Sequence, residues 1–328
     1  MAETAMSEFD ESLMMGVSPK WTKRKALIKM LRAITERKST VTLWANGIAE
    51  YNARRESNNP VNSIPASIDY YAWASRCLAE AMALALQGDE WLPELARASA
   101  YSMFSGRCYH FWHRQFGILF PDNKRGLRSI SFVSMTQSMA FAFLLGWREQ
   151  GVYQGRLTFA ALNHDYQLEL QYTDQHKRAH VFMLRLFADW DGSGLQHNWP
   201  SYGYDQPIYN GILERWRTPD PEVLRPWLLA ACDRHTHEAR SDTSKSFYDF
   251  GDQRLTRTPI EILLVFRLRE YLGLANPVLD HPLMEAPFDR LPEPQPVFEP
   301  DEYMQGTLKR VREDWPQFDA LTSLEALK

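Results

Sequence analysis

The sequence is poor in cysteine and in net charge, and each shortage excludes a class of protein. Only three of its 328 residues are cysteines, and they are far apart: Cys77, Cys108 and Cys232. No CxxC pair occurs, so a disulfide scaffold is excluded and we expect three reduced, buried thiols. The net charge of −4 argues against a dedicated nucleic-acid-binding protein, which is usually basic overall.

Several motifs typical of nucleotide-binding proteins and enzymes are also missing. The sequence contains no GxGxxG, no GxxxxGK[ST], no GxSxG and no HExxH. Nucleotide binding by the two glycine-rich routes, a serine nucleophile elbow and a helical zinc-protease site are therefore not supported. We predict no cofactor. The acidic N-terminus, MAETAMSEFDESLMMG, lacks the basic and apolar regions of a secretory signal, so we expect a cytoplasmic protein.

Long hydrophobic runs are scarce, and only one stretch is a candidate for a membrane-spanning helix. The 19 residues between Arg128 and Arg148 carry no charge, which is long enough to span a bilayer. The first half of this stretch, however, contains six Ser, Thr and Gln side chains, which would need partners in lipid. We therefore predict a central core helix and no stable membrane insertion.

Helix signals, in contrast, are frequent. Ser18-Pro19 is typical of a helix start and predicts a helix to about Lys38. Asp220-Pro221 predicts another to about His237. Thr258-Pro259-Ile260-Glu261 has the spacing of a capping box, in which the Thr and Glu side chains satisfy the first backbone N–H groups of a helix.

The predicted fold is all-α, a multi-helix, bundle-like globule, with one short hairpin around residues 156–172 left open because YQLELQY alternates. We divide the chain into an N-terminal helical part (1–150), a C-terminal helical part that shares its core (151–284) and a tail (285–328). The tail is acidic. Seven prolines between Pro277 and Pro300 predict an extended surface segment. A short helix, Glu302 to Trp315, is expected after it.

The strongest candidate for chemistry is the sequence CDRHTHE, residues 232–238. On a helix, Asp233 and His237 lie four residues apart on one face, so Asp233 could orient His237 as a general base. His235 shares another face with Glu238. A metal site would need further ligands, because imidazoles two residues apart on a helix diverge. The simpler interpretation is a helix end at which positive charge is favourable.

A second histidine pair, His110 and His113, lies three residues apart in YHFWHRQ and so on one helix face. These two imidazoles could bind zinc if a distant carboxylate joined them. The alternative is a half-buried aromatic helix with hydrogen-bonded histidines.

Aromatic residues gather in one predicted loop after Asp191, with Trp199, Tyr202 and Tyr204 among them. Such side chains can anchor a protein partner or stack on a sugar or base. The stretch from Lys20 to Arg55 holds ten basic and two acidic residues, which is also typical of a solvated helix face.

Several segments resemble the helical immunity proteins that bacteria encode beside secreted toxins of polymorphic-toxin and type VI secretion systems. The segments are FMLRLFADW (182–190), WPSYGYDQPIY (199–209), CDRHTHEA (232–239) and TPIEILLVFRLREYLGLANPVLDHPLM (258–284). The resemblance covers about a third of the chain. It implies tight, non-catalytic binding to one cognate toxin, and no catalytic residues are carried over.

Three hypotheses therefore stand. The first is an immunity protein in bacterial competition that occludes its toxin. Its contact residues would include the aromatic loop and acidic side chains: Asp191, Trp199, Tyr202, Tyr204, Asp301 and Glu302. The second is an α-helical, metal-dependent hydrolase built around Asp233, His235 and His237 with His110 or His113. The third is a regulator that contacts nucleic acid through residues 20–55.

Overall fold

The computed structural model describes residues 9–36, 38–53, 64–122, 131–163, 177–243 and 245–327. Twelve α-helices and three short 3-10 helices make up the regular structure of these residues, and none of them lies in a strand. The all-α prediction is confirmed. The α-helices are α1 (Arg24–Thr35), α2 (Lys38–Ala53), α3 (Ile64–Gln87), α4 (Leu92–Leu119), α5 (Phe132–Leu144), α6 (Arg148–Asn163), α8 (Arg178–Asp191), α9 (Pro207–Arg215), α10 (Pro221–Glu238), α11 (Ile260–Tyr271), α12 (Glu302–Asp314) and α13 (Phe318–Leu321).

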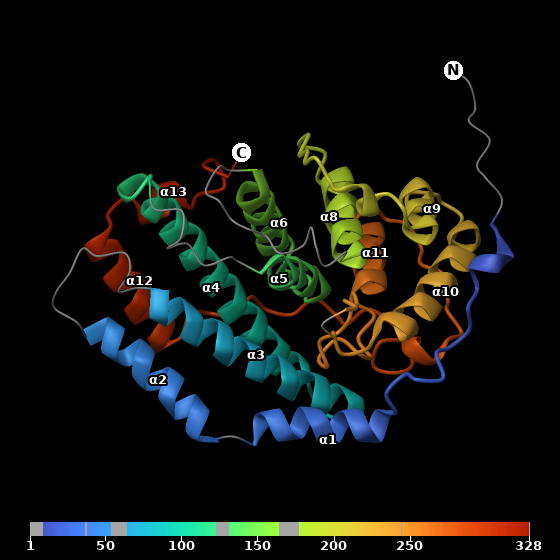
Figure 1. Ribbon diagram of the computed structural model, residues 1–328, viewed down its shortest axis with the longest axis horizontal. Helices are drawn as coiled ribbons and strands as arrows, with labels where there is room; N and C mark the ends of the chain where they lie inside the picture. The colour runs from blue at the N-terminus through green and yellow to red at the C-terminus, as the bar shows by residue number, and fades with distance from the viewer. Residues whose placement is uncertain are drawn as a thin grey trace.

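The long helices α3 and α4 form an antiparallel pair that is the most extensive helix–helix contact of the described chain. Their connection is tight because Gly88, at φ +82°, adopts a left-handed conformation that favours glycine. Helices α1 and α2 run along the outer side of α3, and α5 lies at the centre of the molecule (Figure 1). Helices α8 to α11 occupy the other end.

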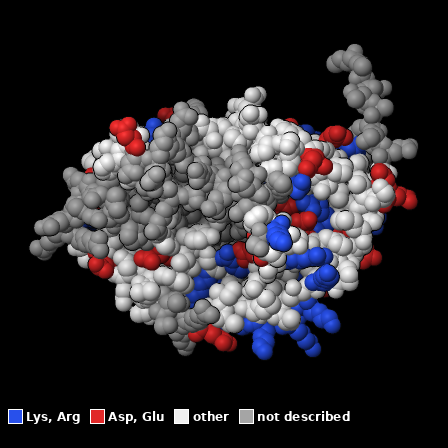
Figure 2. Space-filling view, viewed as in Figure 1, with Lys and Arg blue, Asp and Glu red and all other residues white. Residues whose placement is uncertain are grey.

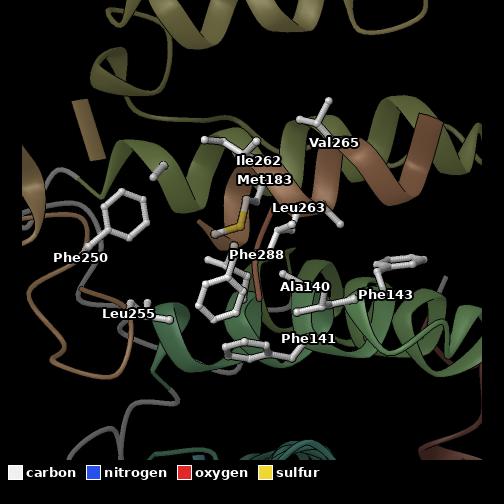
Figure 3. Close-up of a cluster of buried hydrophobic side chains, with 14 of the residues drawn as sticks. Ala140, Phe141, Phe143, Met183, Phe250, Leu255, Ile262, Leu263, Val265 and Phe288 are labelled. Carbon is white, nitrogen blue, oxygen red and sulfur yellow. The ribbon is translucent and has the colours of Figure 1, made fainter. Parts of the chain in front are cut away.

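Helix α5 is the predicted core helix. Its buried side chains contact those of α8 and α11, and Figure 3 shows Phe141 and Phe143 of α5 with Met183 of α8 and Leu263 of α11. Thr136 satisfies its own hydroxyl by donating to the Phe132 carbonyl oxygen at 2.9 Å. In the part of the chain that the structure describes, no helix is both long and apolar enough to cross a membrane.

The C-terminal segment returns to cover α2, α3 and α4. As predicted, residues 277–300 contain no α-helix; they include one 3-10 turn, η4 (Pro282–Met284). Helix α12 begins after them, at Glu302. A second apolar cluster forms there, in which Phe111 and Trp112 of α4 contact Trp315 and Phe318. The first cluster contains residues from both sides of residue 150. The proposed three-part division stays a prediction.

One local prediction is wrong, and one open alternative is only partly tested. Residues 156–163 of the suggested hairpin belong to helix α6, whereas YQLELQY (166–172), the alternating stretch that suggested it, lies outside the described residues. Ser18-Pro19 does not begin a helix, because α1 starts at Arg24. Instead, the Ser18 N–H donates to the Thr236 hydroxyl at 2.8 Å, and the Trp21 indole donates to the Thr256 carbonyl at 2.7 Å. These contacts hold the segment extended against α10 and the loop that follows it.

Candidate functional site

The predicted cluster CDRHTHE occupies the C-terminal end of α10. That helix begins as predicted, because the Asp220 carboxylate accepts a hydrogen bond from the Glu222 N–H at 3.0 Å. At the other end the side chains of Asp233 and His235 face the interior and are 3% and 0% exposed. The chemistry of these residues is therefore decided by their buried partners.

Asp233 does not pair with His237. One carboxylate oxygen of Asp233 accepts the Gly16 N–H at 2.7 Å, and the other accepts a hydrogen bond from Nε2 of His281 at 3.2 Å. His237 Nε2 lies 3.1 Å from the Gly16 carbonyl oxygen, to which it donates. Asp233 and His237 thus share one target, the two backbone groups of Gly16, and together they hold the N-terminal segment on α10.

His281 is a member of this cluster that the sequence analysis did not include. Its Nδ1 accepts the Leu283 N–H at 3.0 Å, so the proton of the neutral ring is on Nε2, where it is donated to Asp233. Burial lowers the pKa of His281, and the Asp233 carboxylate opposes this effect without reversing it. The available sequence signal for His281 was its place directly before Pro282, because a residue before a helix-starting proline often caps the helix with its side chain.

His235 is paired with Glu261, at the start of α11. The two side chains are both 0% exposed, and Nδ1 of His235 lies 2.8 Å from Glu261 Oε1. His235 Nε2 donates to the Leu255 carbonyl oxygen at 3.0 Å, and the ring stacks on Phe250 with 3.8 Å between centroids. Because Nε2 keeps its proton, a second proton must lie between Nδ1 and Glu261. The pair is then neutral as a unit, which is what a fully buried site requires.

This pairing also overturns the predicted capping box. The N-cap of α11 is Pro259, without a side-chain hydrogen bond. The Thr258 hydroxyl donates to the Arg254 carbonyl oxygen at 3.1 Å, and Glu261 is committed to His235. The sequence pattern was present, but a buried imidazole from another helix is the stronger partner for the carboxylate.

Arg234 completes the cluster on the other side of α10. Its guanidinium contacts Glu238 at 2.9 Å and Asp249 at 2.5 Å, and the Asp249 side chain is 1% exposed. Burial raises the pKa of Asp249, while Arg234 acts to lower it. Nε2 of His180 donates to the Asp249 carbonyl oxygen at 3.1 Å, and burial lowers the pKa of His180 to about 4. Arg234 is thus paired with two carboxylates inside the protein, whereas the Asp233 carboxylate is held by hydrogen bonds from Gly16 and His281.

The arrangement is suited to holding chain segments together. It ties the N-terminal segment, the loop 239–259, α11 and the turn at His281 to a single helix end. A general base must reach the proton that it abstracts. Asp233 and His235 are buried, and His237, the predicted base, is half-buried with its Nε2 donating to the Gly16 carbonyl oxygen. Among the described residues, no group of three or more His, Cys, Asp and Glu side chains is placed to hold a metal ion.

The second histidine pair lies inside the core. His110 and His113 of α4 are 0% and 4% exposed, and His113 stacks on Tyr109. Burial lowers the pKa of His113 to about 4, so its ring is neutral at physiological pH. No third ligand joins these imidazoles in the part of the chain that is described.

The aromatic loop presents one of its rings to solvent. Trp199 and Tyr202 are buried, at 8% and 5% exposure, whereas Tyr204 is 50% exposed. The Arg185 guanidinium lies over the Tyr204 ring, 4.6 Å from its centroid. The Asp191 side chain is 4% exposed and is held by Arg156 at 3.2 Å. Of these four predicted contact residues, Tyr204 alone offers a surface that a partner can reach without rearrangement.

The two acidic candidates lie elsewhere. Asp301 is the N-cap of α12 and accepts hydrogen bonds from the Met304 N–H, at 3.0 Å, and from the Tyr101 hydroxyl. Glu302 is exposed. Figure 1 shows α12 at the opposite end of the molecule from α8 and α9, which flank the aromatic loop. The structure therefore separates the predicted contact residues into two surfaces.

A groove beside α12 was not predicted. Its volume is about 490 Å³, and it lies between α4, α6, the proline-rich segment and the C-terminal helices. The floor is apolar and includes Met103, Phe104 and Phe298, with Val297 46% exposed at the edge. The groove could not be read from the sequence, because its walls come from four segments that only the fold brings together.

The described basic residues of the region 20–55 lie on α1 and on the segment just before it, while Arg37, Arg54, Arg55 and the Lys38 side chain lie outside what the structure describes. Leu27 and Leu31 face inward and are buried. Basic side chains project from the lower edge of the molecule in Figure 2, where α1 lies. The exposed lysines of this basic face are Lys20, Lys23, Lys25 and Lys29.

Comparison of the chain with protein-family models, with curated proteins and with solved structures finds no match in any of the three.

Proposed function

We propose that the protein is an immunity protein, which binds a cognate bacterial toxin and neutralises it by occlusion, without catalysis. The observation that carries the proposal is the contrast between the polar cluster at the end of α10 and the apolar groove beside α12. The polar cluster on α10 is committed to holding the chain together, whereas the groove beside α12 is open and apolar. The family resemblance of residues 182–284 supports the same function.

The groove can supply the binding energy. Interfaces are dominated by a few large side chains that enter well-packed pockets. An apolar anchor buried in the groove would contribute about 1.5–3 kcal/mol, and the groove has room for more than one. Met103 and Met304, which line it, have flexible side chains that adapt to the shape of a partner.

The charge around the groove indicates the partner's chemistry. The carboxylates of Glu293, Glu299 and Glu302 are exposed on the segments that form one side of the groove. Arg107 and Asp319 both line the groove, and the Asp319 carboxylate is balanced by Arg107 at 2.7 Å and by Arg312 at 2.7 Å. We therefore expect a toxin segment with an apolar anchor flanked by Lys or Arg, as on the basic surface of a nuclease. Complementary charge mainly accelerates encounter and enforces specificity.

The first test is rescue. The toxin encoded by the gene next to this one is expressed with and without the protein, and the purified pair is studied by calorimetry. We expect survival only on co-expression and a stable complex in solution. A toxin that kills equally in the presence of the protein, or that shows no heat of binding, would overturn the proposal.

The second test places the interface in the groove. Val297→Asp puts a charge on its apolar edge, and we expect binding to weaken by about 100-fold, which corresponds to about 2.7 kcal/mol. The matched control is Val278→Asp, since Val278 is 83% exposed and does not line the groove. Equal affinities for the two variants would remove the groove from the interface and leave toxin binding itself intact.

A further inference from the structure

Four polar side chains of the uncharged stretch that the sequence analysis singled out, Ser131, Ser134, Gln137 and Ser138, line a second cavity. Two adjoining spaces of about 130 and 30 Å³ lie among α3, α4, α5 and α6. They share Tyr71, Ser102, Ser134 and Ser138. Tyr71 is 38% exposed, so the cavity meets the protein surface beside it. We call this space the serine–glutamine cavity.

Three hydroxyl protons in the cavity are committed, whereas the Ser99 hydroxyl, which lines the smaller space, has no hydrogen-bond partner among the described residues. Ser138 donates to the Ser134 carbonyl oxygen at 2.9 Å. Its proton is thus used, and Ser102 must be the donor in the 2.5 Å contact between the two side-chain oxygens. Ser105 donates to the Ser67 carbonyl oxygen at 2.7 Å. The oxygens of Ser102 and Ser105 are left as acceptors, which an occupant with O–H or N–H groups would satisfy.

Two amide side chains in the cavity also have polar atoms without partners among the described residues. Gln154 is 0% exposed and lines the larger space, and neither its Nε2 nor its Oε1 has a hydrogen-bond partner in the part of the chain that the structure describes. Gln137, 6% exposed, lines the smaller space with an unpartnered Nε2. Buried polar atoms are almost always hydrogen-bonded, because leaving them unpaired is costly. Two such amides facing one cavity point to a polar occupant.

The charge balance indicates a neutral occupant. Among the described residues, no carboxylate lines the cavity. The guanidinium of Arg254, which borders the smaller space, is held by Asp252 through contacts of 2.8 and 2.9 Å. An ammonium group would find no counter-ion there, and an anion would have to compete with Asp252. A hydroxyl group, in contrast, can donate to the serine oxygens and exchange hydrogen bonds with both amides.

We propose that the serine–glutamine cavity binds a small neutral ligand with several hydroxyl groups, of the polyol or monosaccharide class. The combined space corresponds to about five water molecules at about 30 Å³ each, which sets the scale of the ligand. The Tyr71 ring provides an apolar face at the entrance. This site lies apart from the α12 groove and does not depend on the proposed function.

The experiment uses the purified full-length chain with glycerol, erythritol and glucose as separate probes. Binding is followed by saturation-transfer NMR and titrated to saturation. Gln154→Leu keeps the size of the side chain and removes both amide groups, and we expect it to weaken binding of the preferred probe by about tenfold. Gln150→Leu, one turn away on α6, is the control, because Gln150 does not line the cavity.

Saturable binding of one probe that is weakened by Gln154→Leu and kept in Gln150→Leu supports the proposal. The absence of saturable binding by all three probes would overturn it, and so would equal binding by the two variants. A crystal structure of the soaked protein gives a second criterion. Ordered water alone at Gln154, undisplaced by any probe, would assign the cavity to structural water.

Discussion

The buried pair of His235 and Glu261 makes the clearest prediction, because it decides whether the α10 cluster is structural. The variant Glu261→Leu leaves the His235 ring at 0% exposure without its partner at Nδ1. Breaking a buried pair by removing one member costs about 3–5 kcal/mol. We expect Glu261→Leu and His235→Leu each to lower the free energy of unfolding by about that amount.

The double variant separates the pair from simple loss of packing. When both polar groups are replaced by apolar ones of similar size, no buried group is left unpaired, and such replacements are often neutral. We expect the double variant to lose less than the sum of the single losses, with a coupling of about 2 kcal/mol or more. Urea unfolding followed by fluorescence and circular dichroism measures all four proteins.

Two results would refute this reasoning. Single variants that lose less than about 1 kcal/mol would show that the pair does not hold α10 to α11. Strictly additive losses would show that the two side chains act independently. A related control is toxin protection, which we expect to survive in the double variant at a temperature where it stays folded.

Further predictions test the other parts of the account. Asp233→Asn weakens the hydrogen bond with the Gly16 N–H, and we expect faster hydrogen exchange and proteolysis in residues 9–22 with little change elsewhere. Unchanged exchange and proteolysis in residues 9–22 would show that Asp233 does not hold the N-terminal segment on α10. Burial lowers the pKa of His113 to about 4 from 6.5. Between pH 6.5 and pH 4, His113 therefore binds a proton more readily in the unfolded state than in the folded state. As the pH drops from 7 to 5, this difference lowers the free energy of unfolding by about 2 kcal/mol. His113→Phe should reduce the acid sensitivity of urea unfolding by that amount, and an identical pH profile would count against it. Replacing Lys23 and Lys25 of the basic face by Glu should leave toxin protection unchanged, and a salt-dependent gel shift of nucleic acid by the wild type, lost in this variant, would favour the regulator instead.

The sequence was a reliable guide where a local signal decided the structure. Asp220-Pro221 began α10, the proline-rich segment lacked α-helix, and the uncharged stretch became the core helix α5. These outcomes follow from the geometry of proline, from the capping side chain and from hydrophobic burial, and none of them requires knowledge of a distant residue.

Prediction failed where a distant partner competed with the local one. Glu261 has the spacing of a capping residue, but His235 lies beside it in the fold. Ser18-Pro19 has the pattern of a helix start, but its backbone is held by Thr236. The pairing of Asp233 with His281 spans 48 residues and leaves no periodic trace in the sequence. Tertiary contacts overrode local propensity in each case.

The candidate surfaces were less predictable than the fold. An aromatic loop suggests a contact surface, but whether its rings face outward depends on packing, which buries Trp199 and Tyr202 and exposes Tyr204. The α12 groove combines residues from α4, α6 and the C-terminal segments. No single window of sequence contains it.

The most direct test of the central claim, that the protein binds a cognate toxin, is a calorimetric titration of the purified protein into the product of the adjacent gene, which the proposal identifies as that toxin. The account predicts one saturable transition with nanomolar affinity, which is typical of specific protein pairs. That affinity should be lost in Val297→Asp and kept in Val278→Asp. No heat of binding to that toxin, together with turnover of a small molecule that depends on His237, would contradict the claim that this protein acts by occupying another macromolecule.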